Sequence, residues 1–255
     1  MSFVVDVVYK YRLKAKTDEM RTPETKRIDA RVPLAPRVSL SSIAAVFQKD
    51  WRSEWRTRAA LNASVLFAVA APIALSFSVA RQKLAPETLA GCLWTVLLFA
   101  ALVGLARAFV KEEENNTAWL LRLNCASEAV LWGKALFNLA LLVLTQIAAV
   151  PIFVLLLGAR IEKPGLLLEV LFLGDIGLAA ASTLLGAIAS QARARGALFS
   201  AIAVPILLPL LVSSSVATAG ALGASGAIPS LGIIAAYDVI LVAASWLLFD
   251  FVWSA

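Results

Sequence analysis

The sequence contains no histidine, only two cysteines and few charged residues. The missing histidine removes the commonest general base and the commonest metal and haem ligand. Cys92 and Cys125 are far apart and form no Cys-x-x-Cys motif, so they indicate neither a disulfide framework nor a metal site. The chain also has no G-x-x-x-x-G-K-[ST] motif to hold a nucleotide. We therefore expect a protein that is not an enzyme and that binds no metal or other cofactor by itself.

The composition is typical of a membrane protein. Apolar residues make up 60% of the chain and charged residues 16%, whereas a soluble domain has about half and about a quarter. Three long runs contain no Asp, Glu, Lys or Arg, namely Ala59–Ala80, Ala135–Ala159 and Gly196–Tyr237. Because about 20 apolar residues cross a bilayer as a helix, these runs predict transmembrane helices.

The apolar pattern predicts an all-α, polytopic membrane protein with six transmembrane helices. Gly220, Gly223, Gly226 and Pro229 divide the longest run into two spans. The predicted spans are residues 61–80, 87–108, 134–158, 166–190, 197–217 and 230–252. With an amphipathic helix ahead of the first span, they form a predicted transmembrane domain over residues 42–255.

Residues 1–41 differ from the rest of the chain. Their second half is polar and basic and carries Pro23, Pro33 and Pro36, a composition typical of disorder. We interpret them as a mostly disordered cytoplasmic arm. The alternatives are an arm that binds lipid or a partner, and an extension from a misplaced start codon. The net charge of +6 does not indicate nucleic-acid binding, because the basic residues gather at the ends of apolar runs, where lipid headgroups lie.

Residues 42–58 have the pattern of an amphipathic helix. Phe47, Trp51 and Trp55 recur every four residues and share one helix face, while basic residues lie largely elsewhere. This pattern indicates a helix that lies in the membrane interface and contacts lipid. The alternative is a cytoplasmic start to the first span. Both interpretations place this helix at the cytoplasmic leaflet.

A polar segment, residues 107–134, separates the second and third predicted spans. Its acidic run precedes good helix-capping residues at Asn115–Thr117, which predicts a short helix with apolar side chains. Such a helix suits docking into a cleft of a soluble partner, although an interfacial linker helix has the same composition. The candidate contact residues are Glu112, Glu113, Glu114, Trp119, Leu120 and Leu123.

Two carboxyl groups lie near the middle of predicted spans. Asp175 is in the fourth span and Asp238 in the sixth, at similar depth and with no Lys or Arg at that depth. A carboxylate there costs about 2.5–3.5 kcal/mol unless it faces other helices or water. One hypothesis is a polar seam that lines a route for a substrate or for protons. The alternative is a buried, hydrogen-bonded packing contact.

The distribution of basic residues predicts the orientation of the spans. One side has ten Lys and Arg residues near the spans: Lys49, Arg52, Arg56, Arg58, Arg107, Lys111, Arg122, Lys134, Arg193 and Arg195. The other side has four: Arg81, Lys83, Arg160 and Lys163. Because basic residues are enriched in cytoplasmic loops, we expect both termini and the polar segment in the cytoplasm.

Several stretches taken together resemble one family, haem exporter protein B (CcmB), among the ABC-2-type permeases. The resemblance covers residues 44–252 and depends on the order and spacing of loose motifs. The motifs are Gly91–Trp94, Phe99–Arg107, Lys111–Glu114, Lys134, Leu173 with Gly174 and Gly177, Arg193 with Arg195 and Gly196, and Val204 with Pro205, Pro209 and Leu210.

The resemblance implies a permease subunit in the inner membrane of a bacterium, acting in cytochrome c biogenesis. It implies a separate ABC ATPase that binds the ATP, a second copy of the chain, other membrane proteins of cytochrome c maturation, and haem as substrate. Met occurs only at positions 1 and 20, so the spans offer no His or Met axial ligand for haem iron. Two alternatives remain: an ABC-2 permease for a lipid, glycan or drug, and a membrane scaffold that transports nothing.

Overall fold

Seven helices make up the part of the chain that the structure describes. The computed structural model describes residues 39–79, 82–114, 121, 125–190, 195–225 and 231–254. The helices are α2 (Leu40–Thr57), α3 (Ala59–Val79), α4 (Pro86–Glu114), α6 (Ser127–Leu157), α7 (Pro164–Ser190), α8 (Arg195–Ala221) and α9 (Leu231–Ser254). The predicted all-α class is confirmed. Of the predicted arm, residues 1–38 lie outside the described residues, whereas Ser39 caps α2 and the helix begins at Leu40.

The helices from α3 to α9 are the six that are long and apolar enough to cross a membrane, as predicted. The amphipathic helix α2 is not a span. Most ends agree with the prediction to within about one turn. Two ends differ, because α4 continues to Glu114 and α6 already begins at Ser127, where the sequence predicted spans ending at 108 and starting at 134. Both differences lie in the polar segment.

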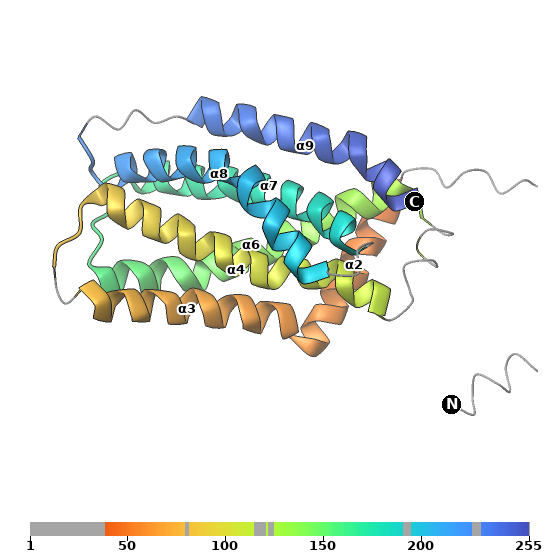
Figure 1. The fold of residues 1–255 in the computed structure, drawn as a ribbon, viewed down its shortest axis with the longest axis horizontal. Helices are drawn as coiled ribbons and strands as arrows, with labels where there is room; N and C mark the ends of the chain where they lie inside the picture. The colour runs from red at the N-terminus through yellow and green to blue at the C-terminus, as the bar shows by residue number, and fades with distance from the viewer. Residues whose placement is uncertain are drawn as a thin grey trace, which may run out of the picture. The chain divides into compact units, whose positions relative to one another are not determined.

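Helix α7 packs against four other spans. It contacts α4, α6, α8 and α9, while α3 packs against α4 and α6. The long helices lie alongside one another in Figure 1. Gly174 of α7 allows close contact with α4, because a Cβ atom at this position would overlap the ring of Trp94. The same buried indole donates a hydrogen bond from Nε1 to Thr218 Oγ1 of α8 at 2.8 Å, so one side chain connects three spans.

Helix α2 turns sharply into α3. Arg58 between them adopts the left-handed conformation, with φ of 51°, which is uncommon for a residue with a side chain. Glu54 Oε1 accepts hydrogen bonds from the backbone N–H groups of Ala60 at 2.7 Å and Leu61 at 3.0 Å. A carboxylate at this position satisfies two unpaired donors at the start of α3. In Figure 1, α2 lies at the end of the spans where α9 ends, and its main contacts are with α6.

Candidate functional site

The described parts of the polar segment are largely helical. Its first residues, 107–114, complete α4, and its last, 127–134, begin α6. The run Glu112–Glu114 therefore ends helix α4. The short helix predicted after it falls on residues 115–124, of which the structure describes Leu121 among the apolar side chains of that helix, so that helix stays a prediction. Trp119, Leu120 and Leu123 lie outside the described residues. Leu121 is partly buried and packs against a cluster formed by the ends of α6, α7 and α9, so it is not a freely exposed apolar residue.

The start of α6 packs closely against α2. Gly133 of α6 lies beside Val46, and a Cβ atom at Gly133 would come within 2.7 Å of the Val46 side chain and 3.0 Å of the Ile43 carbonyl oxygen. Val46 is 3% exposed. Glycine at this position therefore allows the two helices to approach more closely than any side chain would permit.

A buried ion pair lies next to this contact. Lys134 Nζ donates a hydrogen bond to Asp50 Oδ2 at 3.1 Å, and the Lys134 side chain is fully buried. The other carboxylate oxygen of Asp50 lies 3.0 Å from Lys49 Nζ. Asp50 follows Val46 by four residues, so both side chains lie on the face of α2 that contacts α6. The ion pair joins residues that are 84 positions apart in the sequence.

The contribution of this ion pair to stability depends on its burial. An exposed pair contributes about 0–1 kcal/mol, but removing one partner of a buried pair costs about 3–5 kcal/mol because the other charge is left unpaired. Lys134 has no access to solvent in the described structure. Separation of α2 from the start of α6 is therefore strongly disfavoured.

The same turns of α6 also bind the end of α9. Ser127 Oγ donates to Asp250 Oδ1 at 2.6 Å, and Trp246 Nε1 donates to Glu128 Oε1 at 3.2 Å. An apolar cluster fills the space between α6, α7 and α9. Its buried members are Val130, Leu131, Ala187, Phe249 and Trp253. Residues 127–134, which directly follow the predicted docking segment, thus contact three other helices.

The predicted aromatic face of α2 forms a stacked column. The ring centroids of Phe47 and Trp51 are 5.8 Å apart, and those of Trp51 and Trp55 are 6.0 Å apart. Trp55 is 57% exposed, and the Arg58 guanidinium lies 5.3 Å from the centre of its ring. The column is therefore partly available for contact with lipid. Its role at a membrane interface stays a prediction.

Asp175 is hydrogen-bonded within the spans. The carboxyl group is 1% exposed, and its Oδ1 accepts a hydrogen bond from Gln146 Nε2 of α6 at 2.7 Å. Further along the same interface, Asn138 Nδ2 donates to Thr183 Oγ1 at 2.9 Å. Asp175 and Asn138 each make one hydrogen bond across this interface, whereas Asp175 Oδ2 and Asn138 Oδ1 have no hydrogen-bond partner among the described residues.

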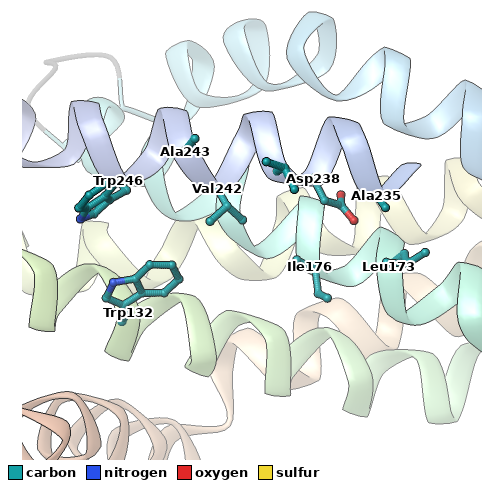
Figure 2. Close-up of a pocket in the computed structure, with 9 residues that line it drawn as sticks. Trp132, Leu173, Ile176, Ala235, Asp238, Val242, Ala243 and Trp246 are labelled. Carbon is teal, nitrogen blue, oxygen red and sulfur yellow. The ribbon is translucent and has the colours of Figure 1, made fainter. Parts of the chain in front are cut away.

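Asp238 is buried without such a partner. It is 5% exposed, and neither carboxyl oxygen has a hydrogen-bond partner among the described residues. Its carboxyl group lies against Gly177 of α7, where a Cβ atom would collide with Oδ1. It also lines an open groove of about 470 Å³ between α6, α7 and α9, with Trp132 and Trp246 towards the other end (Figure 2).

The two carboxyl groups lie on different sides of α7. Asp175 points to α6, whereas Asp238 packs on Gly177, and positions 175 and 177 are about 160° apart around a helix. These two residues alone therefore do not form one continuous seam. Whether either of them takes part in transport stays a prediction.

Sequence reasoning missed Asp50 and Gln146. The spacing from Val46 to Asp50 was a usable signal, because it places an acidic residue on the buried face of a helix rich in basic residues. The sequence shows Gln146 as a polar residue inside an apolar run, but it does not show that Asp175 is its partner. In the part of the chain that the structure describes, no cluster of His, Cys, Asp and Glu side chains is suited to hold a metal ion.

Comparison with known protein families identifies a match that covers most of the chain. The family model described as CcmB protein matches residues 41–251, which include nearly all of α2 and α9 and the whole of the five spans between them. A search of curated proteins finds no match for the chain. The matched range covers most of the 255 residues, including the ion pair, both intramembrane carboxyl groups and the polar segment.

Proposed function

Because the chain belongs to the CcmB protein family, the permease component of the haem exporter in cytochrome c maturation, we propose that it is the part of this exporter that ATP hydrolysis moves. The chain is a multi-pass membrane protein and a permease subunit, and the ATPase is a separate partner, CcmA. In our proposal CcmA docks on the segment Glu112–Leu123. The movement then passes directly into α4 and α6, which flank the segment.

The position of the acidic run supports this docking site. Glu112–Glu114 are the last three residues of α4. The C-terminal end of a helix carries a partial negative charge, so acidic residues there are unfavourable unless a cation compensates for them. A basic surface on the ATPase would supply that compensation.

Charge reversal tests the docking site. We expect the combined Glu113→Lys and Glu114→Lys substitutions to reduce the amount of CcmA that co-purifies with the permease in detergent. Glu87→Lys is the matched control, since Glu87 is an exposed residue at the opposite end of the same helix. Undiminished CcmA in the double variant, at equal permease level, would refute the proposed site.

The proposed orientation places both termini and the docking segment in the cytoplasm of a bacterium, with the chain in its inner membrane. The ten-to-four excess of Lys and Arg on one side supports it. The aromatic column of α2, with basic residues on the same helix, would then lie at the anionic cytoplasmic leaflet.

We further propose that the exporter contains two copies of this chain with two copies of CcmA, and that other membrane proteins of cytochrome c maturation act beside them. Haem would be the substrate. Because the spans contain neither His nor Met, the usual axial ligands for its iron would come from a partner. This chain would supply movement, and the partner would hold the iron.

A further inference from the structure

Building on the proposed function, we propose that Asp50 and Lys134 are a pair of positioning residues that makes α2 move together with the start of α6 during transport. Lys134 lies in the second turn of α6, the helix that follows the segment Glu112–Leu123 on which the ATPase would act. Asp50 is its partner on α2. The pair would therefore carry movement from the docking segment to the helix at the membrane interface.

The geometry supports a rigid joint. The ion pair is buried at 3.1 Å, and the adjacent contact between Gly133 and Val46 leaves no space between the two helices. Opening the pair would separate the fully buried Lys134 ammonium from the Asp50 carboxylate, and separating a buried charge pair is costly. The two helices thus stay attached while the rest of the bundle rearranges.

The joint lies where its movement can reach other helices. Helix α2 continues into α3 through one left-handed residue, and Glu54 caps the start of α3. A displacement of α6 that carries α2 along would therefore also reach α3. At the same time, Ser127 and Glu128 connect the first turn of α6 to α9. Movement of residues 127–134 would then reach α2 and α3 near the N-terminal end of the sequence and α9 at its C-terminal end.

The test compares ATP hydrolysis with transport in the complete exporter. In Lys134→Met and in Asp50→Asn, we expect CcmA to remain bound and ATP hydrolysis to continue, while the c-type cytochrome formed per ATP hydrolysed falls about tenfold. The exchange variant, Asp50→Lys with Lys134→Asp, should recover most of this ratio. Lys163→Met, which removes an exposed lysine at the opposite end of the spans, is the control and should leave the ratio unchanged.

The outcomes separate this inference from the proposed function. An unchanged ratio in Lys134→Met and Asp50→Asn would overturn the joint. A loss of permease from the membrane in the single variants, with no recovery in the exchange variant, would assign the pair to folding alone and would also overturn it. Normal c-type cytochromes in a strain lacking the whole chain would instead overturn the proposed function.

Discussion

Gln146 Nε2 donates a hydrogen bond to Asp175 Oδ1 across the interface between α6 and α7, at 2.7 Å and away from solvent. This contact supports a packing role for the first of the two intramembrane carboxyl groups, and we predict that role for Asp175. An asparagine at position 175 keeps an acceptor oxygen in the same place. We therefore expect Asp175→Asn to leave both the permease level and the yield of c-type cytochrome unchanged.

Asp175→Leu should behave differently from Asp175→Asn. It leaves the Gln146 amide without its acceptor inside the spans, which costs about 1–3 kcal/mol. The purified permease should unfold at a lower temperature in detergent, as followed by size-exclusion chromatography after heating. A marked loss of cytochrome in Asp175→Asn at normal permease level would contradict the packing assignment.

Asp238 should show the opposite relationship between stability and function. Its carboxyl oxygens have no hydrogen-bond partner among the described residues, and a buried carboxylate costs about 2.5–3.5 kcal/mol. Replacing it with leucine removes this cost. We expect Asp238→Leu to raise the unfolding temperature and to lower cytochrome yield, because a destabilising residue is retained where function needs it.

The contrary result for Asp238 is equally clear. If Asp238→Leu lowers the unfolding temperature while cytochrome yield stays normal, the carboxyl group has a structural role and takes no part in transport. Asp175→Leu serves as the comparison in the same assay, since the two substitutions are chemically identical and lie on different sides of α7.

Gly177 is required for the close approach of α9 to α7. A Cβ atom there would meet both the Asp238 carboxyl group and the Leu210 side chain. Gly177→Ala should therefore destabilise the permease by about 1–3 kcal/mol, measured as the loss of monodisperse protein on heating. Gly232→Ala on α9 is the control, because a Cβ atom there has no neighbour within 4 Å. Equal stability of the two variants would contradict this packing.

The predicted orientation can be checked with one pair of matched substitutions. Arg56→Cys on α2 and Arg160→Cys between α6 and α7 both replace exposed arginines. In a chain without the native cysteines, a membrane-impermeant thiol reagent added to intact spheroplasts should label position 160. It should label position 56 only after permeabilisation. Labelling of position 56 in intact spheroplasts would reverse the orientation.

The spans could be predicted from the sequence because their signal is local. Ala59–Ala80 and Ala135–Ala159 lack charges over a length that crosses a bilayer, and no partner is needed to see this. The predicted third span begins later in the sequence than α6 does, because the prediction used only this local apolar pattern. In the sequence, Glu128 and Lys134 appeared as charges of the polar segment, whereas the fold pairs them with Trp246 and Asp50.

The site was harder to predict than the spans because it depends on pairs that are distant in the sequence. Hydropathy does not show that Lys134 is fully buried, since its partner Asp50 lies on another helix. Similarly, Asp175 and Asp238 lie at matching depths in the sequence pattern, but depth does not define which side of a helix each residue faces. The interhelical contacts supplied that information.

The central claim is that the ATPase acts on the segment Glu112–Leu123, which begins in the last turn of α4. The most direct measurement is site-specific photo-crosslinking in native membranes, with the photoreactive residue at position 113 and, as control, at position 87 of the same helix. Our account predicts an adduct with the mass of one permease plus one CcmA from position 113 and none from position 87. Absence of this adduct from position 113, in membranes where both proteins are present, would contradict the account.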